Sequence, residues 1–377
     1  MPISKWRRRV GIFTRPIDQG TSGSGSHLKQ LVQQIIQQNT TFEIWLIHHK
    51  RKELEIYSKA REVIVSRNPL KASLQLRGFG FDLLHFSPLT LSSPLWGLDV
   101  KRVATIHGDA PHFLPELYRK WRVLHRRIVV PLYARKMDYI FTVSETSRRF
   151  IADEYGVDAS RIKLTCNAVT DEFKVLPREG IRHEVKVRYG IDKPFVLHIS
   201  RFSERKNPWV ILEGFRVALD MAGEGGNLRL VLCGSGWDNP IVRAFVGERG
   251  MSEKVIMAGF VEEKDLVKFL NLAEVFVFPS LYEGYGMPNL EAMACGCPVI
   301  TSRVFAIPEV VGDAAVLLDD GSDPCELGCK IMNVIRDSDL RTSLISKGLK
   351  NVGRFSWEES AKTVLETYGD CLSSRRN

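Results

Sequence analysis

Short apolar runs alternate with polar or amphipathic segments through the first half of the chain. The runs lie at residues 9–15, 43–49, 62–66, 81–87, 103–109 and 139–145, and several end in a polar residue. Between the first two runs, residues 26–38 place their apolar side chains on one helical face: Leu28, Leu31, Val32, Ile35 and Ile36. This rhythm predicts a βαβ start and a parallel sheet covered by helices.

A polar stretch over residues 171–194 interrupts this rhythm, and a second series of strand-like runs follows at 195–200, 228–234, 254–260, 275–280 and 298–302. We therefore expect an N-terminal domain over residues 1–172, a linker over 173–193 and a C-terminal domain over 194–356. The amphipathic segment 357–377 follows Ser356, which suits a helix cap, and is expected to pack back on the first domain.

The predicted fold class is α/β, with two Rossmann-like, doubly wound parallel-sheet domains that face a central cleft. In such sheets ligands bind beyond the carboxyl ends of the strands. The chemistry is therefore expected in the loops that follow the strand-like runs.

The composition is that of an ordinary globular protein, since 44% of the 377 residues are hydrophobic and 26% are charged. The formal net charge of +9 favours a polyanionic partner, but it does not choose between nucleic acid, an anionic membrane and a phosphorylated ligand. The seven cysteines form no C-x-x-C pair, so we expect buried structural thiols, including Cys295, Cys297, Cys325 and Cys329, and a reduced, cytoplasmic compartment. The basic N-terminus leads into a strand, and no run is long enough to span a membrane, which predicts a protein that is neither exported nor transmembrane.

The segment FPSLYEGYGMPNLEAMACGCPVITS contains the sharpest chemical signal. A glycine-containing loop follows the run 275–280, Pro288 suits the first turn of a helix, and Glu283 and Glu291 fall before and just inside that helix. Loop amides and the helix dipole favour a phosphate there, while the two carboxylates can accept hydrogen bonds from sugar and ribose hydroxyls. The alternative for Glu291 is an acidic residue that only stabilises its own helix.

Two cations follow the run 195–200. Arg201 and Lys206 lie five residues apart on this loop, where they can neutralise a diphosphate and stabilise the charge that develops as a nucleoside diphosphate departs. The alternative is a solvated basic turn, and we expect that role for Arg205.

These segments resemble glycosyltransferase family 4, the retaining transferases of the GT-B fold. The matching residues are Glu283 and Glu291 in EGYGMPNLE, AMACGCPVI, Arg201 with Lys206, AGFVEEKDL and IPEVVGDAAVLLD. The resemblance implies that Glu283 contacts the donor sugar, Glu291 the ribose, and Arg201 and Lys206 the diphosphate. It further implies donor contacts from Gly286, Met287, Pro288 and Asn289, and base contacts from the backbone at Phe260 and Val261. Phe305-Ala306 stands where many relatives carry paired glycines before Ile-Pro-Glu, so the contour near the donor is expected to differ.

The N-terminal half supplies weaker candidates. The loop with Gly20, Gly23 and Gly25 is either a flexible turn or, as the resemblance favours at Gly23, a phosphate-approaching loop. His107 ends the run 103–109, where it either hydrogen-bonds the donor sugar or a nearby acceptor, or is a structural histidine. Asp109 is a softer candidate for an acceptor-side base.

Two further segments bear on metal and membrane binding. Asp337-Ser338-Asp339 suits a helix cap better than a metal site, so neither a metal nor another cofactor is expected, and the two cations would replace Mg²⁺. Residues 117–136 interleave seven Lys and Arg with apolar side chains. This segment is either a surface for an anionic membrane or lipid-linked acceptor, or an ordinary packed helix with a solvated basic face.

Together these features predict a metal-independent hexosyltransferase, and the resemblance implies that it retains the anomeric configuration and acts in polysaccharide biosynthesis. It would move a hexose, by resemblance mannose from GDP-mannose, from a nucleotide-sugar donor to a hydroxyl of a glycan or lipid-linked acceptor. It would be cytoplasmic, with peripheral contact at the inner face of the membrane. The alternatives are a phosphorylase or sugar synthase of the same fold, and a non-catalytic nucleotide- or nucleic-acid-binding protein. No nucleic-acid partner is expected, because the chain lacks a recognition motif and an aromatic ladder.

Overall fold

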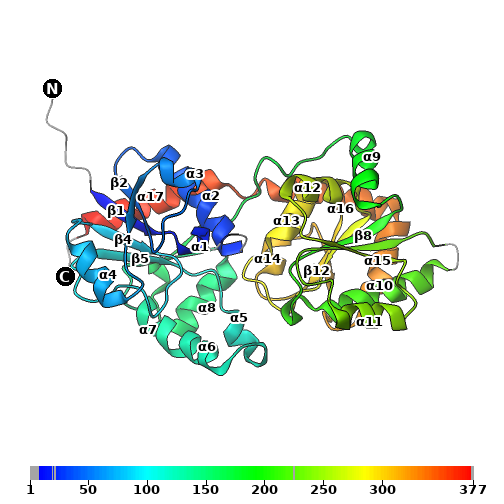
Figure 1. Cartoon of the computed structure of the whole chain (residues 1–377), viewed down its shortest axis with the longest axis horizontal. Helices are drawn as coiled ribbons and strands as arrows, with labels where there is room; N and C mark the ends of the chain where they lie inside the picture. Colours follow the sequence, from blue (N-terminus) through cyan, green and yellow to red (C-terminus); the bar gives the residue numbers. More distant parts are fainter. Residues whose placement is uncertain (1–7, 19, 21–22, 224–225, 375–377) are drawn as a thin grey trace. The chain divides into compact units, whose positions relative to one another are not determined.

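The computed structural model describes residues 8–18, 20, 23–223 and 226–374. The chain forms two compact units, one built from residues 1–167 with 356–377 and the other from residues 168–355. Each unit holds one parallel sheet with helices around it (Figure 1). The predicted α/β class with two doubly wound parallel sheets is confirmed.

The first unit contains a seven-stranded parallel sheet in the order β3-β2-β1-β4-β5-β6-β7. Its strands are β1 Arg9–Phe13, β2 Glu43–His48, β3 Arg61–Ile64, β4 Leu83–Phe86, β5 Lys101–Thr105, β6 Tyr139–Thr142 and β7 Ile162–Leu164. Its helices are α1 Arg15–Asp18, α2 Gly23–Gln38, α3 Glu55–Ser58, α4 Pro69–Arg77, α5 Ala110–Phe113, η1 Pro115–Leu117, α6 Lys120–Leu124, η2 His125–Val129, α7 Val130–Ala134, α8 Glu145–Tyr155, η3 Ala159–Arg161 and α17 Trp357–Ser373. The strand order reverses direction between β1 and β4.

The second unit contains a six-stranded parallel sheet in the order β10-β9-β8-β11-β12-β13. Its strands are β8 Phe195–Ile199, β9 Arg229–Cys233, β10 Val255–Gly259, β11 Val275–Phe278, β12 Val299–Ser302 and β13 Val316–Leu318. Its helices are α9 Arg178–Tyr189, η4 Glu204–Lys206, α10 Pro208–Ala222, α11 Pro240–Glu248, α12 Glu263–Leu272, α13 Met287–Ala294, α14 Ile307–Val311, α15 Pro324–Arg336 and α16 Ser338–Val352. The order reverses between β8 and β11.

Helix α17 completes the core of the first unit, and Figure 1 shows it (red) running back along that unit beside α2. Its residues Ala361, Val364, Tyr368 and Cys371 are fully buried among side chains of α2 and the sheet. His85 at the end of β4 contacts the Tyr368 hydroxyl through Nδ1 at 2.6 Å and the Thr105 hydroxyl through Nε2 at 2.7 Å. The buried imidazole therefore ties α17 to β4 and β5.

The range 173–193, expected to be a linker, instead holds helix α9 and belongs to the second unit. Ile181 and Val185 are buried, Tyr189 packs edge-on against Phe269 at 4.8 Å, and Arg188 pairs with the buried Asp265 at 2.5 Å. The linker prediction is therefore wrong. An apolar pair one turn apart, among many charges, gives too weak a periodic signal for recognition from sequence.

Candidate active site

The loop after β8 presents Arg201 on a fixed backbone. The Trp237 indole donates to the Ser200 carbonyl at 2.8 Å, and the Phe202 amide donates to the Ser235 carbonyl at 2.9 Å, so both neighbours of Arg201 are anchored to the loop after β9. The Arg201 side chain is exposed and has no hydrogen-bond or ion-pair partner in the described part of the chain. This guanidinium is therefore available to an incoming anion.

Glu283, on the loop after β11, joins two cations of the β8 loop. Its Oε1 accepts hydrogen bonds from Lys206 Nζ at 2.5 Å and Arg205 Nη1 at 2.6 Å. Arg205 also donates to the Tyr282 carbonyl at 2.6 Å, while the Leu281 amide donates to the Arg205 carbonyl at 2.9 Å. The sequence thus placed Lys206 and Glu283 correctly in one cluster, but Arg205 is part of that cluster and not a solvated turn residue.

The cluster is largely shielded from water. The side chains of Lys206 and Glu283 are 12% and 13% exposed, and the Lys206 ammonium lies 4.2 Å from the centre of the Phe278 ring. Burial acts to raise the pKa of Glu283, but the charges and hydrogen bonds of Lys206 and Arg205 outweigh it and hold the pKa below its ordinary value. Burial lowers the pKa of Lys206, against the attraction of Glu283. Because the hydrogen bonds from Lys206 and Arg205 both end on Oε1, Oε2 of the ionised Glu283 is left for a ligand hydroxyl.

Gly286 makes the tight turn into α13. Its φ is 92°, and an added Cβ would lie 2.4 Å from Cδ1 of Ile307. Met287 and Pro288 then open the helix half-buried, whereas Asn289 is fully buried and its amide points to the Thr301 hydroxyl at 3.4 Å. The side chain of Asn289 thus packs inside the second unit under the turn and does not face solvent.

Replacing Gly286 with alanine should lower the stability of the chain by about 2–3 kcal/mol, because the new methyl group overlaps Ile307 and the left-handed backbone disfavours a side chain. Thermal or urea unfolding measures this loss. Gly180 lies in α9, and a Cβ added there would have no atom within 4 Å. Gly180→Ala should therefore be neutral or slightly stabilising, and equal losses for both variants would contradict the role of Gly286.

Glu291 lies in the second turn of α13, slightly deeper in the helix than the sequence indicated. Burial, and then the charge of Glu263 at the start of α12, raise the pKa of Glu291 to about 7. No hydrogen-bond or ion-pair partner of its carboxyl group occurs among the described residues. The carboxyl group is therefore open both to solvent and to a hydroxyl donor of a ligand.

The turn after β10 carries the two residues expected near the base. Phe260 is 70% exposed and Val261 is 4% exposed, and they follow Gly259, whose carbonyl accepts from the Gly234 amide at 2.6 Å. Their backbone therefore lies next to the loops after β8 and β9. This placement agrees with the expected donor side but adds no specific contact.

In the first unit His107 follows β5 and packs edge-to-face against His27 of α2, with ring centres 4.5 Å apart. The His27 ring is held in its orientation, because its Nδ1 forms a hydrogen bond with the side-chain oxygen of Asn167. Burial lowers the pKa of His27 to about 4, and burial together with the charges of His27 and Arg126 lowers that of His107 well below its ordinary value. His107 is thus a neutral hydrogen-bonding group at neutral pH, with no described partner for Nε2. His27 gave no signal in the sequence beyond being a lone histidine in a helix.

Asp109 lies fully buried, where its carboxylate accepts from the Tyr155 hydroxyl and pairs with Arg126 Nε at 3.5 Å. These contacts link the β5 loop to α8 and η2, whereas a base that acts on the acceptor needs a carboxylate open to the acceptor.

Gly23 is the exposed first residue of α2, and a Cβ added to it would have no atom within 4 Å. Nothing around Gly23 requires a glycine, and residues 19, 21 and 22 of the same loop lie outside the described residues.

The predictions for Asp337 and for the cysteines have different outcomes. Asp337 caps α16 by accepting from the amides of Asp339 and Leu340, as predicted. Cys325 and Cys329 are exposed on α15, so their predicted burial is wrong: the buried face of this helix is Leu327, Gly328, Ile331, Met332 and Val334. Within the described ranges no group of three His, Cys, Asp or Glu could hold a metal ion.

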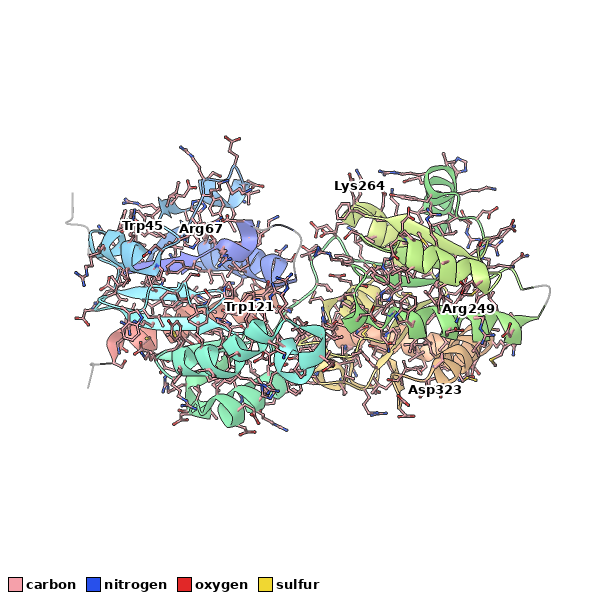
Figure 2. The ribbon with its side chains drawn as sticks, turned by 60° about the horizontal axis from the view of Figure 1, so that its bottom comes forward. Trp45, Arg67, Trp121, Arg249, Lys264 and Asp323 are labelled. Atoms are coloured by element: carbon pink, nitrogen blue, oxygen red, sulfur yellow. The ribbon has the colours of Figure 1, made fainter. Side chains whose placement is uncertain are left out.

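The basic segment 117–136 is helical but irregular, since a π-helical turn, η2, separates α6 from α7. Trp121, Leu124, Ile128 and Leu132 are 60%, 59%, 49% and 50% exposed. Trp121 at the start of this run is labelled in Figure 2. No helix in the described part of the chain is both long and apolar enough to cross a bilayer.

Comparisons with known proteins identify the family of the chain. Residues 182–351 match the family Glycosyl transferases group 1, and residues 21–173 match Glycosyltransferase Family 4. O-antigen chain mannosyltransferase B of Escherichia coli is 32% identical over 276 residues, 71% of this chain and 70% of that protein. Serotype-specific mannosyltransferase WbdA of Escherichia coli is 26% identical over 300 residues, 77% of this chain but only 36% of WbdA.

Among solved structures, the sucrose-phosphate synthase of Thermosynechococcus elongatus has a TM-score of 0.77 at 19% identity, over 98% of this chain and 100% of that one. The fold is that of the GT-B class, and the family matches identify the chain as a glycosyltransferase. The chain belongs to glycosyltransferase family 4, and it resembles bacterial mannosyltransferases.

Proposed function

We propose that the chain is a retaining hexosyltransferase that moves mannose from GDP-mannose to a hydroxyl of a glycan or lipid-linked saccharide. The observation that carries this proposal is the ion cluster of Lys206, Arg205 and Glu283 beside the unpaired Arg201, at the strand reversal between β8 and β11. Ligands of doubly wound sheets bind at such a reversal. The choice of mannose is supported by the name of the Escherichia coli relative that is 32% identical.

In the proposed reaction the bond between the anomeric carbon and the diphosphate oxygen breaks, and the acceptor oxygen bonds to the same face of that carbon. Arg201 and Lys206 stabilise the charge on the departing diphosphate, and its oxygen takes the acceptor proton. Glu283 and the Phe278 ring hold Lys206 in place before the donor arrives, so little reorganisation is needed. The free Oε2 of Glu283 accepts a hydroxyl of the donor sugar, and the Glu291 carboxylate accepts the ribose hydroxyls. His107 contributes a neutral hydrogen bond to the sugar or acceptor.

A transfer assay with GDP-mannose and a mannose-terminated oligosaccharide tests this proposal. We expect an α-linked product from the α-linked donor, identified by NMR, and no loss of activity in excess chelator, because cations of the protein replace a metal. Transfer from UDP-glucose but not from GDP-mannose would contradict the assignment of GDP-mannose as the donor. A β-linked product would contradict retention, and loss of activity that Mg²⁺ restores would contradict metal independence. Use of a free sugar phosphate as acceptor would identify a synthase instead.

We further propose that the first unit contacts an anionic membrane through residues 117–136. Exposed cations accompany the exposed apolar side chains of this segment: Arg119, Lys120, Arg122, Arg127, Arg135 and Lys136. Lys136 also lies 4.1 Å from the ring centre of Trp96, which is itself 55% exposed. Apolar side chains that insert between lipids and cations that meet their headgroups are typical of interfacial helices.

Trp121→Ser combined with Leu124→Ser should weaken binding to phosphatidylglycerol-containing vesicles at least about tenfold, because each buried large apolar side chain contributes ~1.5–3 kcal/mol. Co-sedimentation at low and high salt measures this binding. Val187→Ser with Ile241→Ser is the matched control, since both residues are exposed on the second unit, at 72% and 69%. Equal binding by both double variants, or binding insensitive to salt, would remove the membrane contact.

A further inference from the structure

A buried histidine, His198, ties the loop that carries Arg201 to the sheet of the second unit, and the proposed reaction does not use it. His198 lies near the end of β8 and is 0% exposed. Its Nδ1 lies 2.8 Å from the Val277 carbonyl oxygen of β11, and its Nε2 lies 2.7 Å from the Ser200 Oγ. The ring therefore bridges the two strands at which the sheet reverses and reaches the residue before Arg201.

The surroundings of His198 decide the direction of both hydrogen bonds. The Val277 carbonyl oxygen can only accept, so Nδ1 carries the ring proton and Nε2 offers a lone pair. The Ser200 hydroxyl therefore donates to Nε2. Burial lowers the pKa of His198 to about 3, although the hydrogen bond to Val277 acts in the opposite direction. The ring is thus neutral at neutral pH, with one tautomer and one orientation.

Ser200 is fixed through its backbone as well as through its side chain. Its amide donates to the Cys233 carbonyl at 2.9 Å, and its carbonyl accepts from the Trp237 indole at 2.8 Å. The loop after β9 approaches this carbonyl so closely that a Cβ added to Gly234, whose φ is 124°, would lie 2.1 Å from the Ser200 oxygen. The hydrogen bond to His198 fixes the side chain in addition. The peptide that follows Ser200 is therefore held in one orientation.

We infer that His198 is a positioning residue for sugar transfer and acts through Ser200 on Arg201. The inference rests on the proposed function, in which Arg201 stabilises the charge on the departing diphosphate. Arg201 is exposed and has no partner among the described residues, so its backbone decides where the guanidinium can reach. A fixed backbone narrows the space that this long side chain samples, which lowers the entropy lost when it binds an anion.

The same histidine also lies beneath the second cation of the site. Its ring stacks on the Phe278 ring, with ring centres 5.9 Å apart, and the Lys206 ammonium lies 4.2 Å from the centre of the Phe278 ring. A charged imidazole here would repel Lys206, whereas the neutral ring of His198 supports it without that cost.

A double-mutant cycle between Ser200→Ala and Arg201→Ala tests the inference, with inorganic diphosphate as the probe and calorimetry of the full chain as the measurement. Ser200→Ala should weaken diphosphate binding about 2–10-fold, because the hydrogen bond that orients the loop is lost. In the Arg201→Ala background the same substitution should cause no further loss, since the side chain that it positions is absent. Equal losses in both backgrounds, or unchanged affinity in Ser200→Ala, would overturn the inference. A wild-type chain that does not bind diphosphate would overturn it as well.

Variants at position 198 separate the hydrogen bond from the packing of the ring. His198→Phe keeps an aromatic ring but has no acceptor, so it should lower diphosphate affinity and the kcat of transfer at least as much as Ser200→Ala. His198→Gln offers its amide oxygen to the Ser200 hydroxyl and should recover at least half of this loss. A loss in His198→Gln as large as in His198→Phe would overturn the role of Nε2. If His198→Phe does not fold, the double-mutant cycle alone decides.

Ser360→Ala is the matched control for Ser200→Ala. The buried Ser360 hydroxyl donates to the Cys166 carbonyl at 2.7 Å in the first unit, so one hydrogen bond of similar length is lost. This control should lose some stability but keep its diphosphate affinity and kcat. A decrease in both quantities equal to that of Ser200→Ala would show a general effect of stability and contradict positioning.

Failure of this inference is separable from failure of the proposed function. Transfer from GDP-mannose is measured on the same wild-type sample. Coupling between Ser200 and Arg201 in diphosphate binding, without transfer from GDP-mannose, would support the positioning role and refute the proposed donor. Transfer from GDP-mannose without this coupling would support the donor and refute the role of His198.

Discussion

Replacing Lys206 with methionine should lower kcat/KM for sugar transfer by about 10²–10³-fold, the usual loss when one preorganised donor to a developing anion is removed. Methionine keeps an apolar stem over the Phe278 ring but takes away the ammonium that stabilises the leaving diphosphate. The loss should appear mainly in kcat, because the charge on the diphosphate grows as the reaction proceeds. Steady-state kinetics with GDP-mannose measures the change.

Lys330→Met is the matched control for this prediction. Lys330 lies in the same unit, is half-buried and pairs with Glu326, as Lys206 pairs with Glu283. The control should lose some stability through its broken ion pair but keep its kcat. A Lys206→Met variant that stays folded and retains activity within about threefold would refute the leaving-group role, since the expected effect is far larger.

Replacing Glu291 with glutamine should stabilise the folded chain at pH 8 and weaken its binding to GDP. The pKa of Glu291 is raised to about 7 in the folded state, from an ordinary value of 4.5. Well below pH 4.5 the carboxyl group of Glu291 is protonated in both the folded and the unfolded chain, so it does not lower the stability of the fold. As the pH rises from 4.5 to 7 the unfolded chain gains stability by ionising, and above 7 the full cost to the folded state, roughly 3 kcal/mol, is present. Glutamine removes this cost, so the variant should melt at a higher temperature at pH 8 but not at pH 4.5.

The affinity for GDP should move in the opposite direction. If Glu291 accepts the ribose hydroxyls as a carboxylate, wild-type affinity should rise between pH 6 and pH 8 as the group ionises, and Glu291→Gln should bind at least about tenfold more weakly at pH 8. Thermal shift and calorimetry on the same samples give both quantities. Glu253→Gln, at an exposed position of the second unit, should change neither. Unchanged GDP affinity in Glu291→Gln, despite higher stability, would leave Glu291 without its ribose role.

Most of the fold could be predicted from the sequence because buried parallel strands read as uninterrupted apolar runs. The elements that escaped are short or strongly charged. Strands β7 and β13 contain three residues each, too few for a period to show, and α9 carries a single buried pair, Ile181 and Val185. Tertiary contacts, such as Arg188 with Asp265, stabilise α9, and these contacts leave no local pattern.

The candidate site was predictable in its residue types but not in its pairings. Spacing placed Arg201, Arg205 and Lys206 on one loop, yet it could not tell which side chains turn inward. The short turn η4 directs Arg205 and Lys206 to Glu283 and leaves Arg201 in solvent. The contact of His27 with His107 likewise depends on how α2 packs across the sheet, which the sequence of α2 alone does not specify.

The dependence of the first unit on α17 also bears on how the chain is made. Tyr368 fills a place beside His85 that the N-terminal strands cannot fill themselves, and residues 356–374 leave the ribosome only after every strand of both sheets has emerged. The core of the first unit therefore stays incomplete, with part of the apolar surface of its sheet uncovered, while the second unit is synthesised and folds. A nascent chain of this enzyme is consequently most exposed to chaperones in the half that was translated first.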